Sequence, residues 1–340
     1  MTPDSELHVE ASRCIRCGAC ATLAPGVFDV GGSSSRVLRP AAAAERVFVE
    51  AARWICPTDA IRGAPDDDAS RAPVETSDAR LFHDLATSAE RVRWSLSELK
   101  LDDIDRTLAP PELRSVVREM AFSENATYSA TQRFLDAFFD DVDFSQWISV
   151  WFYEETRHPH VLTEWLRRVG DPVTADFVVK GRVSTPLMRS IFGTLVTNLI
   201  SEVTAAQAYR RLAARSPEPI LGGIARLIAG DEARHAATFF RFARRYIAAA
   251  PRESNWRERA RGLEVLRAWL GGVERATHPV AQMVERLNEA GNDQGALDLD
   301  FTSVHKRVVR VVGLLLALPL RREDEVAPML KELLSERRES

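Results

Sequence analysis

Two short stretches decide the fold of this chain: EETRH at residues 154–158 and DEARH at residues 231–235. In each stretch the second residue is a glutamate, and the fifth, three positions later, is a histidine. Residues three apart in an α-helix lie on one face, so both side chains of a pair can bind the same metal centre. The two stretches therefore predict two helices that face one metal site.

Each pair has a further glutamate upstream, at an almost constant interval. Glu124 precedes Glu155 by 31 residues (155 − 124), and Glu202 precedes Glu232 by 30 (232 − 202). All four acids extend stripes of apolar residues at helical spacing, which predicts that they point inward. Four carboxylates cannot be buried together unless cations compensate them, because an unpaired buried charge is strongly unfavourable. Four helices around two divalent cations would meet this requirement.

The complete pattern resembles the metal-binding helices of soluble acyl-carrier-protein desaturases, over roughly residues 110 to 250. Those enzymes belong to the ferritin-like di-iron oxidases and oxygenases, in which two helices each give one glutamate and two others each give a Glu-x-x-His pair. The resemblance implies a mainly α fold, a ferritin-like four-helix di-iron bundle with extra helices. It implies two irons, or a Mn/Fe pair, because both metals accept imidazole and carboxylate ligands. The six expected metal ligands, which would also be the catalytic residues, are Glu124, Glu155, His158, Glu202, Glu232 and His235.

The surroundings of the expected ligands carry further predictions. Glu154 and Asp231 directly precede two ligand glutamates, and the resemblance implies that they orient the histidines. Ala205 stands where plant-type desaturases have a threonine, three residues after the third ligand glutamate. Pro159 predicts a kink or bulge, because proline clashes with the carbonyl four residues back. Both departures indicate a remodelled oxygen or substrate pocket. The expected lining of that pocket is Tyr128, Phe152, Ala205, Ala206, Tyr209 and Phe239.

A second pattern lies near the amino terminus, where CIRCGAC at residues 14–20 is followed by CPTDAI at residues 56–61. Three clustered cysteines and a remote Cys-Pro resemble a single-cluster bacterial ferredoxin, over about residues 5 to 64. The alternatives are a zinc site, for which an unbroken triplet is atypical, and two disulfides, which do not suit a reducing cell interior. A third alternative is a three-iron cluster formed by loss of iron, although relatives that carry three irons usually lack the second cysteine, which is present here as Cys17. The resemblance implies that one [4Fe-4S] cluster is held by Cys14, Cys17, Cys20 and Cys56.

The chain is long enough for two domains, and its composition suggests where they divide. We predict an α+β ferredoxin domain at 1–64, a linker at 65–78 with an acidic run and few apolar residues, and a ferritin-like di-iron domain at 79–340. Helices beyond the four metal-binding ones would cover the bundle, form a homodimer contact or shape a substrate entrance. The segments with helical patterns are approximately 78–99, 110–140, 143–169, 185–214, 218–249, 254–289 and 301–336.

Together the two patterns predict an O2-dependent di-iron oxidoreductase of desaturase or hydroxylase type. O2 would be the co-substrate, and the organic substrate would be a small molecule or be bound to a carrier protein. Electrons would come from the chain's own ferredoxin domain, which an external ferredoxin reductase would reduce again after each transfer. Trp147 and Trp151 are candidate stepping stones for electrons on their way to the metals. Linking donor and acceptor raises their effective concentration.

Two other functions share parts of these patterns. Di-iron N-oxygenases of amines also follow a glutamate with Asp-Glu-x-x-His, but they add a histidine where this chain has Ile228. Rubrerythrin-like peroxide reductases join an iron-sulfur donor to a di-iron bundle and need no organic substrate.

Net charge and hydropathy limit the kinds of partner that the chain can bind. The net charge of −4 argues against electrostatic binding of nucleic acid. The apolar run at residues 311–320 is too short to span a bilayer, and no secretory signal is seen. We therefore expect a cytoplasmic protein that binds neither nucleic acid nor membrane.

Overall fold

The computed structural model describes residues 6–63, 68–69, 81–183, 190–250, 252–272, 278, 283 and 301–335. Apart from residues 68 and 69, the predicted linker at 65–78 lies outside the described residues. So do 184–189, at the start of one predicted helix, and most of 273–289, at the end of another. The described chain is mainly helical, with two small sheets near the amino terminus, which confirms the predicted fold class.

The N-terminal part is a small α+β unit. Strand β1 (His8–Val9) pairs antiparallel with β4 (Ile61–Arg62), and β2 (Phe28–Gly31) pairs antiparallel with β3 (Ser34–Val37). Two helices pack beside them, α1 (Ala19–Leu23) and α2 (Arg46–Ile55). Gly18, with φ of 81°, lets the chain turn from the first cysteines into α1, a conformation that L side chains rarely adopt.

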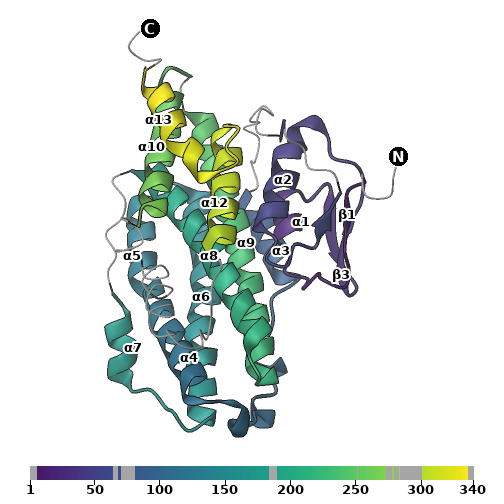
Figure 1. Cartoon of the computed structure of the whole chain (residues 1–340), viewed down its shortest axis with the longest axis vertical. Helices are drawn as coiled ribbons and strands as arrows, with labels where there is room; N and C mark the ends of the chain where they lie inside the picture. The colour runs from purple at the N-terminus through teal and green to yellow at the C-terminus, as the bar shows by residue number, and fades with distance from the viewer. Residues whose placement is uncertain are drawn as a thin grey trace.

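The larger part is a bundle of long helices that run side by side (Figure 1). Side-chain caps begin three of them: Asp141 accepts a hydrogen bond from the backbone N–H of Phe144, Ser190 from that of Gly193, and Glu218 from those of Ile220 and Leu221. The bundle consists of α4 (Pro111–Glu124), α5 (Thr127–Ala137), α6 (Val142–Arg168), α8 (Ile191–Arg215) and α9 (Pro219–Ala249).

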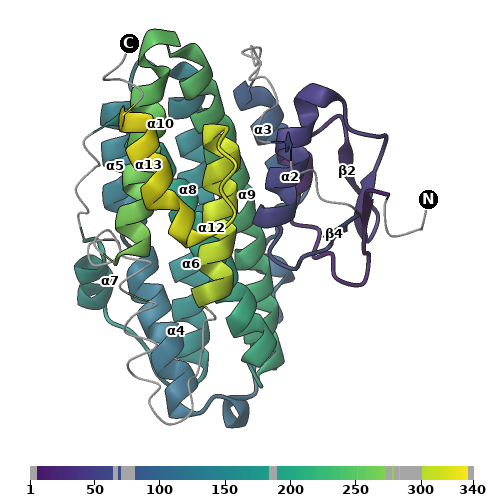
Figure 2. The same cartoon turned by 45° about the horizontal axis from the view of Figure 1, so that its top comes forward.

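Further helices cover the bundle. Helix α12 contacts α8, α9 and the N-terminal helix α2, and α10 packs on α8 (Figures 1 and 2). Within the described residues, no helix combines the length and the hydropathy needed to cross a membrane. The covering helices are α3 (Leu81–Glu90), α7 (Ala175–Gly181), α10 (Arg252–Leu270), α12 (Phe301–Leu316) and α13 (Val326–Ser335). The 3₁₀ turns are η2 (Ala43–Glu45), η4 (Leu96–Glu98), η5 (Leu101–Asp103), η6 (Arg106–Leu108) and η7 (Glu323–Glu325).

The predicted helix at 110–140 is broken in the structure, and Glu124 is the last residue of α4. The Asn125 amide donates to a carbonyl one turn back at 2.7 Å and so competes with the backbone pattern. Just beyond the break, the Thr127 hydroxyl donates to Glu155 at 2.8 Å. Polar side chains that bond to the backbone or to another helix therefore end α4 at Glu124, one of the expected metal ligands.

Two other helix predictions differ from the structure. The predicted helix at 301–336 is two helices, because Ala317 adopts a left-handed φ of 54° after α12 and Pro319 follows it. The bulge expected at Pro159 is not formed, since α6 continues through this residue as an α-helix. Pro159 is itself buried, with Leu162 and Trp165 packed in the core on the following turns, and this packing outweighs the lost backbone hydrogen bond.

Helix α9 lies between the two parts of the chain (Figures 1 and 2). One side of it packs against α8 and α6, and the other contacts α1 and α2. Across this second contact, the rings of Phe48 and Phe240 meet edge to face at 6.1 Å, and Arg241 donates to the carbonyl of Thr22 at 3.2 Å. The N-terminal unit is thus packed on the back of a helix that carries two expected metal ligands.

Candidate metal centres

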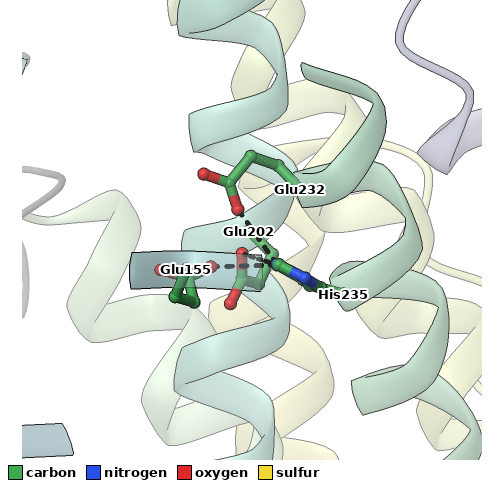
Figure 3. A group of neighbouring side chains, drawn as sticks. All are labelled: Glu155, Glu202, Glu232 and His235. Atoms are coloured by element: carbon green, nitrogen blue, oxygen red, sulfur yellow. Dashed lines mark ion pairs between the residues drawn. The ribbon is translucent and has the colours of Figure 1, made fainter. Parts of the chain in front are cut away.

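The six expected ligands come from four helices and converge in the bundle. Glu155, Glu202, Glu232 and His235 form one group whose ligand atoms all lie within 4.8 Å of one another. Glu124, Glu155 and His158 form a second group that meets the same limit. Glu155 belongs to both, so the two groups form one site with room for two ions that share a carboxylate. Figure 3 shows the first group, with His235 facing three glutamates.

Both histidines present Nδ1 to this cluster of carboxylates. The Nδ1 of His235 lies 2.9 Å from Glu155, 3.4 Å from Glu232 and 3.7 Å from Glu202. The Nδ1 of His158 lies 3.5 Å from Glu124 and 3.6 Å from Glu232. Nδ1 is therefore the ring nitrogen that each histidine can offer to a metal.

The other ring nitrogen is held by an acid from the opposite helix. The Nε2 of His158, on α6, lies 3.1 Å from Asp231 Oδ2 on α9. The Nε2 of His235, on α9, lies 3.0 Å from Glu154 Oε2 on α6. A carboxylate on Nε2 fixes a proton there and leaves Nδ1 as a lone pair for a cation. The acids next to the ligand glutamates thus orient the histidines crosswise between the helices.

Unsatisfied polar atoms show that this site fits metal ions. His158, His235, Glu155, Glu202 and Glu232 are all at least nine-tenths buried. Among the described buried side-chain atoms without a hydrogen-bond partner are Nδ1 of both histidines and Oε1 of Glu155. Buried polar groups normally have hydrogen-bond partners. These nitrogen and oxygen atoms instead present lone pairs toward one another, and such atoms are metal ligands. Divalent ions would satisfy all of them together.

The pKa values reflect the concentration of negative charge. Burial, together with the charges of Glu155 and Glu202, raises the pKa of Glu232 well above its usual range. Burial alone would lower the pKa of both histidines, but the surrounding carboxylates outweigh it and raise their pKa well above the usual value. Protons or metal ions must therefore compensate the carboxylates.

This electrostatic balance predicts that the stability of the metal-free form depends on pH more strongly than that of the metal-loaded form. Groups with raised folded-state pKa stabilise the metal-free fold fully below their unfolded values of 4.5 for glutamate and 6.5 for histidine, and that stabilisation is lost as pH rises. The melting temperature of protein without bundle metals should fall by at least about 3 °C between pH 6 and pH 8. Metal-loaded protein should show no such fall, because metals bind deprotonated ligands. Calorimetry of both forms checks this, and a rising melting temperature in the metal-free form would contradict it.

Hydrogen-bond donors that the sequence did not reveal hold the ligand carboxylates in place. The Tyr209 hydroxyl donates to Glu124 at 2.5 Å, and the Trp151 indole donates to Glu202 at 3.2 Å. Thr127 donates to Glu155 from just after the break between α4 and α5. These donors lie on other helices at no fixed sequence interval from their acceptors, so no local pattern could have identified them.

A second set of side chains supports the acids behind the histidines. The Trp94 indole donates to Asp231 at 2.8 Å, and Arg93 pairs with Glu154 at 3.0 Å. The guanidinium of Arg157 lies 3.9 Å from the centre of the Trp94 ring. One signal was present in the sequence, since Arg157 and Arg234 each directly precede a ligand histidine. Both arginines are buried beside the metal site.

A cavity opens beside the ligands, between the break after α4 and helix α8. Of the six residues expected to line a substrate pocket, all of which are described, Ala205 alone lines this cavity. Tyr209 bonds Glu124, Phe239 packs in an aromatic cluster with Trp147, and Tyr128 contacts Phe152. The cavity is lined by Ser123, Glu124, Ala126, Thr127, Ala130, Trp151, Glu155, Asn198, Ser201, Glu202, Ala205, Glu232 and His278.

The four cysteines meet in the N-terminal unit around a small cavity that all of them line. They are free thiols, so the disulfide alternative is not realised. Backbone N–H groups of Ser35 and Ala60 donate to the sulfurs of Cys14 and Cys56, each at 3.3 Å. Burial raises the pKa of Cys20 to about 12. A cavity that all four cysteines line, with N–H groups that donate to two of the sulfurs, suits an iron-sulfur cluster.

Comparison with known families agrees with the kinds of domain predicted for the two parts of the chain. The family model described as the 4Fe-4S single cluster domain of Ferredoxin I matches residues 9–63, and the model described as fatty acid desaturase matches residues 124–256. No curated protein and no solved structure gives a match.

Proposed function

We propose a more specific activity than the family comparison gives. That comparison indicates a desaturase-type oxidoreductase, with a 4Fe-4S single-cluster domain followed by a desaturase domain. The chain uses O2 to oxidise an organic substrate at a di-iron centre and receives the electrons from its own cluster. An external one-electron donor, such as a ferredoxin reductase, reloads the cluster. The observation that carries the proposal is the pair of ligand groups that share Glu155 and border a cavity. Helix α9, which carries Glu232 and His235, contacts the cluster domain on its other side.

The ligands of this centre are the six residues predicted from the sequence. Bound iron would supply activation of O2, while the protein holds the ligands and shapes the cavity. Asp231 and Glu154 hold the protons on Nε2 of the histidines, and Tyr209 and Trp151 fix carboxylate oxygens by donating to them. Because these partners are buried, the ligands are oriented before substrate arrives.

The cavity supports a substrate that carries a polar group close to the reacting carbon. Ser123, Asn198, Ser201 and His278 line it together with Ala205 and the ligand carboxylates. The Ser123 hydroxyl is buried without a hydrogen-bond partner, and a bare acyl chain would leave it so, whereas a hydroxyl, carbonyl or amine could bond to it. Hydroxylation or desaturation beside such a group is the proposed reaction. The same lining favours N-oxygenation of an amine as the second candidate.

Oxygen consumption by the reduced holoprotein tests the proposal. We expect slow, peroxide-releasing O2 consumption by the protein alone, and faster consumption coupled to an oxidised product when a small polar substrate from a screen is supplied. Rapid oxidation by H2O2 that no organic compound alters would instead identify a peroxide reductase.

Filling the cavity should block the substrate without removing the metals. Ala205→Leu places three more carbons in the cavity, and we expect substrate-stimulated O2 consumption to fall at least about tenfold with iron content unchanged. Ala214→Leu is the matched control, since Ala214 lies on the same helix but is exposed. Equal activity of the two variants would show that this cavity is not the substrate site.

A further inference from the structure

The cluster domain rests directly on the backbone of α9 at Gly230. A β-carbon added to Gly230 would lie 3.1 Å from Cβ of Cys17, tighter than nearly all real contacts of this kind. A cysteine expected to hold the cluster therefore touches the helix that carries Glu232 and His235. The N-terminal unit lies on one side of α9, and helices α8 and α6 pack on the other (Figures 1 and 2).

One turn further along α9, a single buried guanidinium joins the two sides. Arg234 is 4% exposed, and its Nη1 donates to the carbonyl oxygen of Cys17 at 3.1 Å. Its Nη2 lies 2.5 Å from Asp231 Oδ1 and 3.3 Å from Glu154 Oε2. The Arg234 cation offsets the cost of burying these two carboxylates next to each other. Burial lowers the pKa of Arg234, but the charges of Glu154 and Asp231 outweigh this effect and raise it. Arg234 is therefore charged and fixed.

The two carboxylates continue the connection to both halves of the metal site. Asp231 bonds Nε2 of His158, and Glu154 bonds Nε2 of His235. A chain of hydrogen bonds thus runs from the backbone of Cys17 through Arg234 and branches to the two histidines. Trp151, the stepping stone considered from the sequence, instead donates to Glu202 and lines the cavity.

We propose that Arg234 is the bridge by which electrons pass from the cluster at Cys17 to both sides of the metal pair. The proposal rests on the function proposed above and adds the route. Each passage oxidises the cluster by one electron and reduces the metal pair by one, so two passages complete a two-electron reduction. The cluster regains each electron from the external one-electron donor. Arg234 is a positioning residue that keeps the hydrogen-bonded path between the cluster and the metal pair continuous. It is itself neither oxidised nor reduced.

Arg234→Lys separates this bridging role from simple charge compensation. Lysine keeps the positive charge beside Asp231 and Glu154, but its single ammonium cannot reproduce the planar fork that also reaches the Cys17 carbonyl. Arg244→Lys is the matched control: Arg244 is also buried on α9 and donates to backbone carbonyls, but those belong to Leu314 and Leu315 of α12.

The measurement uses the full chain loaded with both cofactors. The cluster is reduced photochemically in the absence of O2, and loss of its reduced electron paramagnetic resonance signal to the oxidised metal pair is followed by rapid freezing. We expect Arg234→Lys to slow this transfer about ten- to a hundredfold, while Arg244→Lys stays at the wild-type rate. Transfer at the wild-type rate in Arg234→Lys with full metal content would overturn the bridge.

A second pair of variants keeps the test decisive if Arg234→Lys fails to load iron. Gly230→Ala pushes Cys17 away from α9 and leaves every carboxylate untouched, whereas Gly223→Ala adds the same methyl to the same helix with nothing within 4 Å. Transfer should be about two- to threefold slower in Gly230→Ala than in Gly223→Ala. Equal rates would refute the route through this contact. If wild-type protein transfers no electron from cluster to metal pair, the proposed internal donor itself fails, which is a distinguishable result.

Discussion

Replacing Glu155 by alanine is expected to abolish binding of the metal pair while the iron-sulfur cluster remains. Glu155 is the one side chain that belongs to both ligand groups, and its Oε1 is buried without a hydrogen-bond partner. Its loss removes a ligand from both metal positions at once. Iron content should fall from about six per chain to about four.

Mössbauer spectroscopy of protein enriched in iron-57 distinguishes the two kinds of iron in this variant. The signal of the high-spin pair should vanish and that of the cluster should persist. Glu164→Ala provides the control, since Glu164 lies on the same helix but pairs with Arg167 and Arg168 away from the metal site. An unchanged high-spin pair in Glu155→Ala would refute the ligand assignment.

Cys17→Ser is expected to give the complementary result, a loaded bundle that receives no electrons by the native path. Serine is a poor ligand for iron-sulfur clusters, and Cys17 is also the cysteine whose carbonyl contacts Arg234. Turnover supported by the external one-electron donor should fall at least about a hundredfold. Iron in the bundle should remain at its wild-type level.

Chemical reduction bypasses the missing donor and provides an internal control for this second variant. Dithionite with a small mediator should reduce the metal pair of Cys17→Ser directly and restore a single turnover. Ser12→Ala, a change at an exposed position in the same loop, should behave as wild type in both assays. Normal turnover of Cys17→Ser with the external donor would show that electrons reach the bundle without the cluster.

The sequence was informative about the metal site because its ligands follow helical periodicity. A spacing of three residues places a glutamate and a histidine on one helix face, whatever the rest of the fold does. The mainly α fold class followed from the same periodicity and is confirmed. The break at Asn125 was missed because it depends on side-chain bonds that compete with helical hydrogen bonds, and apolar periodicity does not register them.

The cavity was harder to predict because it depends on where helices separate. Tyr209 and Phe239 lie on the expected faces of α8 and α9, but one bonds a metal ligand and the other packs among aromatic rings. Asn198 and His278 line the cavity, although neither belongs to a recognisable pattern. Which side chains border a space depends on the relative rotation and tilt of helices, which short-range spacing does not specify.

The sequence by itself determined which side chains could bind metals: six glutamates and histidines at helical spacing, four cysteines near the amino terminus, and the helices that carry the six. The tertiary structure decided how these parts connect. It alone showed that Asp231 and Glu154 each reach across to the histidine of the other helix, and that Arg234 meets Cys17, which lies 217 residues earlier in the chain. Ligand spacing is a local property of a helix, whereas such contacts arise only when distant segments pack, so no local pattern encodes them.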